Sequence, residues 1–244
     1  MEVTFLGSGD AFSSGGRFHT CIMVKSQTKR FLIDCGASAL IAMKKSNVAP
    51  NDIDMIFLSH LHGDHFGGIP FFIIDAQLIQ KRSKPLLIAG PPGTKERIVE
   101  AMEVFFRGSS KVEQKFSLSI VEFDLQKENR FDDILIHVFE GIHPSGAPSL
   151  ALRIEHEGKV IAYTGDTEWT DSLIPAGKEA DLFISECYFY EKNVKFHLNY
   201  KTLTSHLEKM NPKNVILTHF SEDMLKRIDE IDYMTAEDGK TITI

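Results

Sequence analysis

Histidine and aspartate side chains gather in one short segment of the chain. Four of them lie within six positions, directly after the apolar run at residues 54–59: His60, His62, Asp64 and His65. Imidazole nitrogens and carboxylate oxygens are the ligands of Zn²⁺ and similar divalent cations. In an extended turn the first two histidines point to one side, and Gly63 lets the backbone bend so that Asp64 and His65 face the other. The segment predicts a site for two metal ions, with two ligands for each.

Three more ligand-type residues each follow an apolar strand candidate. His143 comes after residues 134–139, Asp166 after residues 159–164 and His219 after residues 214–217. If these strands are neighbours, their ends bring the three side chains to one rim. We predict that the donors then divide as follows: His60, His62 and His143 on one ion, Asp64, His65 and His219 on the other, and Asp166 bridging both. We expect Zn²⁺, although Mn²⁺, Fe and Ni²⁺ accept the same donors.

The elements that must position these residues follow from periodicity and turn signals. Strands are expected at residues 2–6, 21–25, 30–34, 54–59, 85–89, 116–123, 134–139, 149–156, 159–164, 182–186, 214–217 and 240–244, and helices at 37–45, 69–81, 95–106, 201–210 and 223–231. Runs of strands interrupted by helices in both halves indicate two packed mixed sheets with helices outside, an α/β arrangement. No linker divides the chain, so we predict a single domain over residues 1–244.

The ligand pattern resembles a known family. An HxHxDH run after a strand, a single later histidine, the step Gly165-Asp166-Thr167 and a late His219-Phe220-Ser221 are similar to the metallo-β-lactamase superfamily over nearly the whole chain. The resemblance implies a four-layer αβ/βα sandwich with a dinuclear metal site at one edge. It is strongest toward ribonuclease Z and related phosphodiesterases, on Phe5-Leu6-Gly7-Ser8-Gly9 with Arg17, on Asp34-Cys35-Gly36 and on Glu186-Cys187-Tyr188.

Two further segments of the sequence indicate which branch of the superfamily the chain resembles. The segment from His143 to Gly146 lacks the second histidine of an HxPGH step, which departs from lactonase and glyoxalase relatives. His197 stands one helix before His219, where ribonuclease Z-like enzymes carry an HxT or HxS step, although Asn199 replaces the hydroxyl residue. The resemblance implies that His197 protonates the leaving oxygen or holds a phosphate oxygen. Asp64 is the second expected catalytic residue, because it can orient the nucleophile while it binds a metal.

The resemblance also narrows the substrate. RNA-processing relatives carry a protruding arm between the third histidine and the bridging aspartate, whereas residues 143–166 have room only for two strands and a turn. We therefore predict a dinuclear metal-dependent phosphodiesterase in which a metal-bridging hydroxide attacks a small or cyclic phosphodiester. Two alternatives stay open: a ribonuclease Z-like endoribonuclease, and a hydrolase of a sulfate ester, lactone or thioester at the same dinuclear site.

Composition limits the partners. The net charge is −7, so no broadly basic surface favours tRNA over a small phosphodiester. No apolar run reaches the roughly 18 residues that cross a bilayer, so we expect no membrane partner. Three cysteines without CxxC spacing and a start without a secretory signal predict a cytoplasmic protein. The apolar run at residues 71–74 fits either the core, which we favour, or the face of a homodimer. The remaining histidines named here are expected to have no role in the site: His19, His137, His156 and His206.

Overall fold

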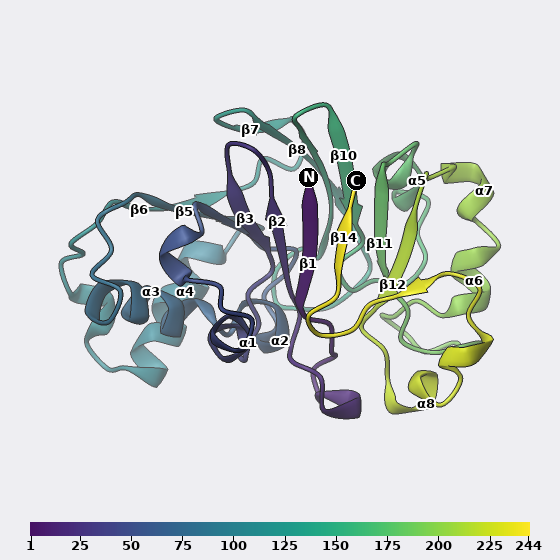
Figure 1. Ribbon diagram of the computed structural model, residues 1–244, viewed down its shortest axis with the longest axis horizontal. Helices are drawn as coiled ribbons and strands as arrows, with labels where there is room; N and C mark the ends of the chain where they lie inside the picture. Colours follow the sequence, from purple (N-terminus) through teal and green to yellow (C-terminus); the bar gives the residue numbers. More distant parts are fainter.

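Two β-sheets of seven strands face each other in a computed structural model that describes residues 1–244 (Figure 1). The first sheet has the order β14-β1-β2-β3-β4-β5-β6, in which β14 to β3 run antiparallel and β3 to β6 run parallel. Its strands are β1 (Glu2–Gly7), β2 (Cys21–Lys25), β3 (Arg30–Ile33), β4 (Met55–Phe57), β5 (Leu86–Gly90), β6 (Leu118–Glu122) and β14 (Thr241–Thr243).

The second sheet repeats this plan in the other half of the chain. Its order is β13-β12-β11-β10-β9-β8-β7, with β7 to β10 antiparallel and β10 to β13 parallel. Its strands are β7 (Asn129–Phe131), β8 (Ile134–Glu140), β9 (Leu150–His156), β10 (Lys159–Tyr163), β11 (Leu182–Glu186), β12 (Val215–Thr218) and β13 (Met234–Thr235). Because β8, β10 and β12 all point the same way, their carboxyl ends lie at one edge of the sheet.

Helices cover the outer face of each sheet, which completes the four layers. On the first sheet lie α1 (Ala39–Lys45), α3 (Ile69–Leu78) and α4 (Thr94–Phe105), at the left of Figure 1, with α2 (Gly63–Phe66) at the lower edge. On the second sheet lie α5 (Leu173–Gly177), α6 (Tyr200–Thr204) and α7 (Leu207–Met210), and α8 (Glu222–Leu225) lies below them. The two apolar layers beneath these helices are separate clusters of buried side chains.

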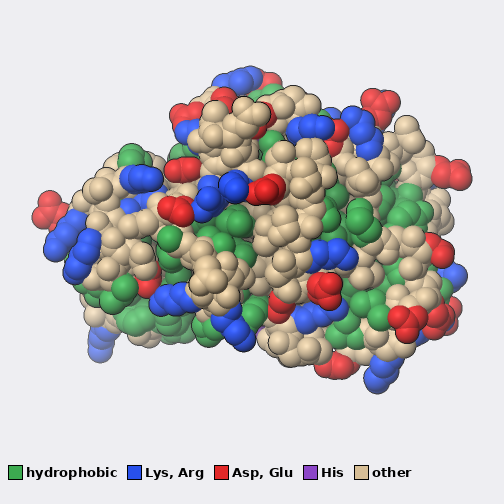
Figure 2. Space-filling view, in the orientation of Figure 1, with side chains coloured by type: hydrophobic (Ala, Val, Ile, Leu, Met, Phe, Trp, Pro, Cys, Tyr) green, Lys and Arg blue, Asp and Glu red, His purple; other side chains and the backbone are tan.

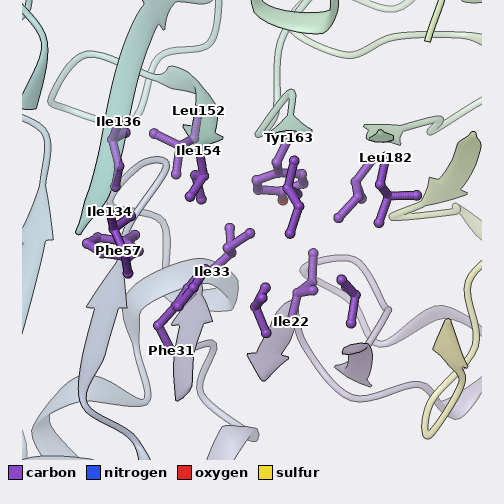
Figure 3. Close-up of a cluster of buried hydrophobic side chains, with 14 of the residues drawn as sticks. Ile22, Phe31, Ile33, Phe57, Ile134, Ile136, Leu152, Ile154, Tyr163 and Leu182 are labelled. Atoms are coloured by element: carbon purple, nitrogen blue, oxygen red, sulfur yellow. The ribbon is translucent and has the colours of Figure 1, made fainter. Parts of the chain in front are cut away.

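The inner faces of the sheets meet in a third apolar cluster. Phe31, Ile33 and Phe57 of the first sheet point toward Ile154 and Tyr163 of the second (Figure 3). Alternate residues of each strand enter this layer, as the two-residue period of a strand requires. The tight packing of this layer fixes the two sheets relative to each other. Side chains that extend from either sheet beyond the lower edge of the layer therefore keep fixed positions relative to one another.

The chain departs from the sequence-based expectations mainly in its helices. The predicted helix at residues 201–210 is two short helices, α6 and α7. The hydroxyl of Thr204 donates to the carbonyl of Tyr200 and that of Ser205 to Thr202, bonds that compete with a continuous helix. The helix predicted at residues 223–231 is also interrupted, into α8 and the 3₁₀ turn Ile228–Glu230. Strands β7 and β13 and helices α2 and α5 were not predicted, because each is only two to five residues long.

The ends of the chain meet in the first sheet. The amino group of Met1 donates to the carbonyl of Ile244, and β14 closes the edge of the sheet beside β1. None of the helices is long and apolar enough to span a bilayer. Basic and acidic side chains alternate over the face seen in Figure 2, without a continuous basic surface. In the apolar run at residues 71–74, Phe72 and Ile73 are buried, which confirms the core assignment for these two.

Candidate metal centre

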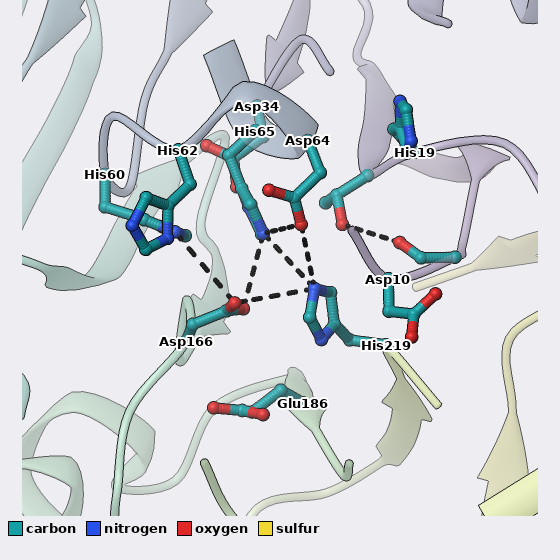
Figure 4. Close-up of polar contacts among 12 residues, drawn as sticks. Asp10, His19, Asp34, His60, His62, Asp64, His65, Asp166, Glu186 and His219 are labelled. Carbon is teal, nitrogen blue, oxygen red and sulfur yellow. Dashed lines mark hydrogen bonds and ion pairs between the residues drawn. The ribbon is translucent and has the colours of Figure 1, made fainter. Parts of the chain in front are cut away.

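The seven predicted ligands lie at one rim between the two sheets, and Figure 4 labels all of them except His143. His60 and His62 follow β4, Asp64 and His65 are in α2, His143 follows β8, Asp166 follows β10 and His219 follows β12. The backbone ties the two halves together there, because the N–H of Leu150 donates to the carbonyl of Ser59. The carboxyl ends of strands from both sheets therefore converge on one place, as the strand-end positions of the residues predict.

The seven residues fall into two of the groups of neighbouring donor atoms in the structure, while His197 and Glu186 take part in two others. His60, His62 and His143 form one, and Asp64, His65, Asp166 and His219 form the other; within each, the donor atoms lie within 4.8 Å of one another. Asp166 reaches both. Its Oδ2 lies 3.9 Å from Nε2 of both His60 and His143 and 3.4 Å from Nε2 of His219, and its Oδ1 lies 3.4 Å from Nε2 of His65. The carboxylate of Asp166 is thus close to nitrogen donors of both groups.

The loop that carries the motif folds differently from the expectation. The backbone is extended at His62, and Gly63 then begins the single helical turn α2 instead of bending an extended chain. Gly63 has a negative φ, and a side chain there would meet no atom within 4 Å. The helical turn itself carries Asp64 and His65 to the second group, so the prediction that Gly63 redirects the chain is wrong.

Asp34 sets the tautomers of two histidines. Its Oδ2 accepts a hydrogen bond from Nδ1 of His65 at 2.7 Å and another from the hydroxyl of Ser59 at 2.8 Å. Since the single hydroxyl proton of Ser59 goes to Asp34, Ser59 accepts from Nδ1 of His60, 3.1 Å away. Both histidines therefore use Nδ1 for these bonds and present Nε2 to the site, the arrangement common around protein-bound metals.

A third histidine is oriented in the same way, by a hydrogen bond from its Nδ1. Two buried donor atoms of the site have no hydrogen-bond partner. Nδ1 of His143 donates to the carbonyl of Phe196 at 2.8 Å, so its Nε2 faces Nδ1 of His62 at 2.9 Å. Nε2 of His60 and Oδ1 of Asp166 are buried without any hydrogen-bond partner. Buried polar atoms of native proteins are nearly always satisfied. Converging lone pairs beside unsatisfied buried donor atoms fit a pair of divalent cations.

The pKa shifts of the site also fit bound cations. Burial lowers the pKa of His65, but the carboxylates of Asp166, Asp64 and Asp34 outweigh it and raise that pKa well above its usual value. The pKa of His219 rises to about 9 because the nearby carboxylates, Asp166 foremost, outweigh its burial. Burial raises the pKa of Asp166, yet the surrounding imidazoles hold it well below its usual value. The carboxylates of the site thus stabilise positive charge placed beside them.

Close backbone approaches build the rim. A Cβ on Gly36 would lie 2.2 Å from the carbonyl oxygen of Asp64, so only glycine lets the end of β3 pass beneath α2. Gly165 has a φ of +57°, and a Cβ there would lie 2.9 Å from the carbonyl oxygen of Leu150. Asp34 and His219 also have positive φ values of 59° and 60°. Strained backbone of this kind persists where surrounding contacts dictate it, often at functional sites.

His197 lies beside the donors without belonging to the seven. Its Nδ1 is 3.0 Å from Oε2 of the buried Glu186 and 4.0 Å from Oδ2 of Asp166. Burial lowers the pKa of His197, but the hydrogen bond and the charge of Glu186 outweigh it and raise the pKa. Asn199, at the place of the expected hydroxyl, caps α6 by accepting from the N–H of Thr202 at 2.9 Å.

A small pocket opens over the centre. It has a volume of about 190 Å³ and is lined by Ala11, Phe12, His62, Asp64, His143, Asp166, Tyr188, His197 and His219. Tyr188 stacks on His197 with ring centres 4.5 Å apart. A larger pocket of about 510 Å³ lies between α3 and α4 and contains none of the seven ligand candidates.

Sequence reasoning missed the roles of Asp34 and Glu186. Both stood in segments that resemble ribonuclease Z, and both are carboxylates at the end of an apolar strand, the same signal that identified Asp166. Phe12 and Tyr188 carried no such signal. The four other histidines lie outside the donor groups: His19 contacts Ser13, His137 is on β8, His156 is buried beside Ser26, and His206 stacks on Trp169.

Comparisons with known proteins agree with this architecture. The model of the family described as Anti-Pycsar protein Apyc1 matches residues 1–240. Ribonuclease Z of Enterococcus faecalis is 25% identical over 284 aligned residues, which cover 93% of this chain and 89% of that protein. The alignment is longer than this chain of 244 residues, so the relative carries insertions that this chain lacks.

Solved structures show the same fold. Human tRNase Z, short form, superposes with a TM-score of 0.81 and 26% identity, covering 100% of this chain and 99% of that one. A diphosphatase from the PhnP family superposes with a TM-score of 0.78 and 17% identity, covering 100% and 97%. The metallo-β-lactamase fold protein YhfI of Bacillus subtilis superposes with a TM-score of 0.78 and 22% identity, covering 99% of each chain, so the two mixed sheets with outer helices are the metallo-β-lactamase fold, as the sequence pattern predicts.

Proposed function

The chain belongs to the family described as Anti-Pycsar protein Apyc1, and from this membership and the geometry of the site we propose that it hydrolyses a small or cyclic phosphodiester at two divalent metal ions. The protein is a metal-dependent hydrolase related to ribonuclease Z. The observation that carries the proposal is the place of Asp166, whose carboxylate lies within 3.4 Å to 3.9 Å of donors from both groups.

We propose the metal ligands predicted from the sequence. His60, His62 and His143 would hold one ion, Asp64, His65 and His219 the other, and Asp166 both. Nitrogen and carboxylate donors suit Zn²⁺, and Mn²⁺, Fe or Ni²⁺ accept the same set. When bound, two such ions supply a hydroxide nucleophile near neutral pH and neutralise charge on the phosphate oxygens.

Residues of the chain itself would orient the attacking water and protonate the leaving alkoxide. Oδ2 of Asp64 lies 3.2 Å from Nε2 of both His65 and His219, so this carboxylate is held at the edge of the pocket, where it can orient the attacking water. His197 is held by Glu186 through Nδ1, which leaves Nε2 without a protein partner on the pocket wall. An imidazolium there can donate a proton to the leaving alkoxide.

The size of the pocket favours a small substrate over tRNA. About 190 Å³ is below the range of roughly 300–1,000 Å³ that is usual for ligand pockets, which favours a small substrate. Between His143 and Asp166 the chain has only β9, β10 and the turn at residues 157–158, with no protruding arm. The net charge of −7 adds no general attraction for a polyanion.

We also propose the setting in which the enzyme works. All three cysteines are free and buried, which suits the reducing cytoplasm. Its partner is a small diester, and we expect no membrane partner. A homodimer remains a prediction, for which the exposed apolar side chains of α4, Val104 and Phe105, offer a contact face; sedimentation velocity of the purified protein tests it.

The deciding experiment pairs metal analysis with hydrolysis. Purified protein is reconstituted with Zn²⁺ or Mn²⁺, its metal content is measured, and its activity is assayed on bis(p-nitrophenyl) phosphate, cyclic AMP and a tRNA precursor. We expect two metal equivalents, turnover of the small diesters and loss of activity in Asp166→Ala. His206→Ala, which changes a histidine stacked on Trp169, serves as the matched control with full activity.

Other outcomes separate the alternatives. Cleavage of the tRNA precursor in preference to the small diesters would support a ribonuclease Z-like endoribonuclease. Two metal equivalents without any phosphodiesterase activity would overturn the proposal and direct the assays to sulfate esters, lactones and thioesters.

A further inference from the structure

One histidine of the candidate metal centre lacks the side-chain hydrogen bond that orients the others around it. His60, His65 and His143 each use Nδ1 for a bond to a group outside the seven proposed ligands. Nδ1 of His219, in contrast, is buried without a hydrogen-bond partner. The direction of the His219 ring therefore depends on its backbone, which has a φ of +60°. A residue other than glycine keeps this left-handed conformation where surrounding contacts impose it.

The carbonyl of Ser8 supplies the contact that imposes it. This carbonyl accepts from the N–H of His219 and from the hydroxyl of Thr218, each at 3.2 Å. Ser8 directly follows β1 of the first sheet and Thr218 ends β12 of the second, so these bonds join the two sheets beside the metal centre. Ser8, Thr218 and His219 are all buried, so bulk water does not compete for the carbonyl.

A carboxylate near the end of the chain holds Ser8 in turn. Asp238 lies in the connection between β13 and β14, which Figure 1 shows in yellow beside the lower end of β1. Its Oδ1 accepts from the N–H and from the hydroxyl of Ser8, both at 2.9 Å, and its Oδ2 accepts from the N–H of Phe18 at 2.8 Å. The guanidinium of Arg17 binds the same connection through the carbonyl of Ala236, 2.8 Å away. The half-buried side chain of Asp238 thus fixes both ends of the loop between β1 and β2.

We propose that Asp238 is a positioning residue for His219: by holding Ser8, it keeps the backbone of His219 in the conformation that directs the ring to its donor group. Asp238 itself bonds to none of the seven proposed ligands. The proposal rests on the proposed function, which makes His219 a metal ligand, and goes beyond it by placing a determinant of metal affinity in the last connection of the chain. Its effect is confined to one ion, because the three histidines of the other group make no bond to Ser8 or Asp238.

The test measures the two metal-binding steps separately. Metal-stripped wild type and variants are titrated with Zn²⁺ in competition with a chromophoric chelator, and His219→Ala and His143→Ala identify which step belongs to which donor group. We expect Asp238→Ala to weaken the step lost in His219→Ala by about ten-fold and to leave the step lost in His143→Ala within about two-fold of the wild type. Asp238→Asn should lose less than Asp238→Ala, because its amide oxygen still accepts from Ser8.

Further variants test the route through Ser8. Ser8→Ala removes one of the three bonds to Asp238, so we expect about three-fold weaker binding in the same step. The double variant Ser8→Ala and Asp238→Ala should lose no more than Asp238→Ala alone, because the hydroxyl then has no partner to lose. The matched control is Glu237→Ala, which removes the neighbouring exposed carboxylate and should leave both steps unchanged.

Several outcomes would overturn the proposal. Equal weakening of both steps in Asp238→Ala would show a general loss of structure, and unchanged steps would show that His219 does not depend on Asp238. Additive losses in the double variant would show that Ser8 and Asp238 act independently. If Asp238→Ala does not fold, Asp238→Asn and Ser8→Ala provide the same comparison of the two steps.

Failure of the proposed function gives a different result. If the wild type binds no metal, hydrogen exchange at the backbone amide of His219, measured by NMR on the metal-free protein, still tests the positioning role. We expect exchange at His219 to be about ten-fold faster in Asp238→Ala, with no change at the amide of Leu150, which bonds to Ser59 where the sheets meet on the other side of the centre. Unchanged exchange at His219 would reject the role.

Discussion

At the residue scale, two of the proposed metal ligands depend on a carboxylate that is not itself one of them. Asp34 bonds Nδ1 of His65 directly and reaches Nδ1 of His60 through the hydroxyl of Ser59. One buried side chain therefore orients a donor in each of the two groups. The carboxylate also makes the imidazole more basic and thus a better ligand.

Replacing Asp34 tests this dependence. We expect Asp34→Asn to weaken metal binding by about 10- to 100-fold, because the neutral amide no longer polarises His65 or fixes the proton of Ser59. Competition with a chromophoric chelator measures the affinity. Asp133→Asn is the matched control, since Asp133 lies 3.6 Å from the buried His156, outside the centre, and should leave the affinity unchanged. An unaltered affinity in Asp34→Asn would contradict the assigned role.

At the element scale, polar side chains at strand ends hold the sheets to their connections. Arg82 is 2% exposed, and its guanidinium donates to backbone carbonyls before and after β4, among them those of Ile53 at 2.8 Å and Pro85 at 2.6 Å. No carboxylate pairs with it. Asp181, at the start of β11, accepts from the N–H of Val160 and from Lys213.

Loss of the guanidinium should destabilise the first sheet. We expect Arg82→Met to lower the free energy of unfolding by about 3 kcal/mol, because several buried carbonyls lose their donors at about 1–3 kcal/mol each. Urea denaturation measures it. Arg97→Met, which breaks a surface pair with Glu100, should change stability by less than about 0.5 kcal/mol. A small effect of Arg82→Met would mean that water replaces the lost donors.

Asp181 makes stability depend on pH. Burial raises the pKa of Asp181, but its bonds to Lys213 and Val160 outweigh that effect and lower the pKa below its usual value. Its contribution is therefore present above the unfolded pKa of about 3.9 and is lost as pH falls through the lower folded value. We expect Asp181→Asn to cost about 1 kcal/mol at pH 7 and this cost to shrink as the pH falls below about 3.9, measured by urea denaturation at each pH. A difference that stays constant with pH would exclude this linkage.

At the scale of the whole molecule, the residues of the candidate metal centre come from both halves of the chain. His60, His62, Asp64 and His65 come from the first half, and His143, Asp166 and His219 from the second. Neither half contains a complete ligand set. Ions that bind this rim connect the sheets at their lower edge, while the apolar layer of Figure 3 connects them above.

Metal should therefore stabilise the entire fold. A ligand that binds only the folded state at 100 times its Kd adds about 2.7 kcal/mol. We expect Zn²⁺ at that excess to raise the thermal midpoint of the metal-stripped protein by several degrees, followed by calorimetry. The double variant His60→Ala and Asp166→Ala should show no such rise. Equal rises in both proteins would place the stabilising ions elsewhere.

Local pattern was enough to predict the strands and the two-sheet plan, and the seven proposed ligands lie close together, although their binding of metal stays a prediction. This worked because strand ends, ligand types and their order are properties of short segments, and because chain direction puts the ends of β8, β10 and β12 at one edge. Short elements such as α2 and β13 were missed, since a few residues carry too little periodicity.

Contacts between residues far apart in the sequence could not be predicted from local pattern. Asp34 and His65 are 31 positions apart, His143 and His62 are 81 apart, and only packing of the sheets brings them to hydrogen-bond distance. The αL backbone of Asp34 and His219, the buried Glu186 behind His197 and the exposed ring of Phe12 at the pocket mouth likewise exist only in the folded chain. Spacing in sequence predicts which residues can bind metal, whereas the packed sheets determine which nitrogen of each histidine is free to do so.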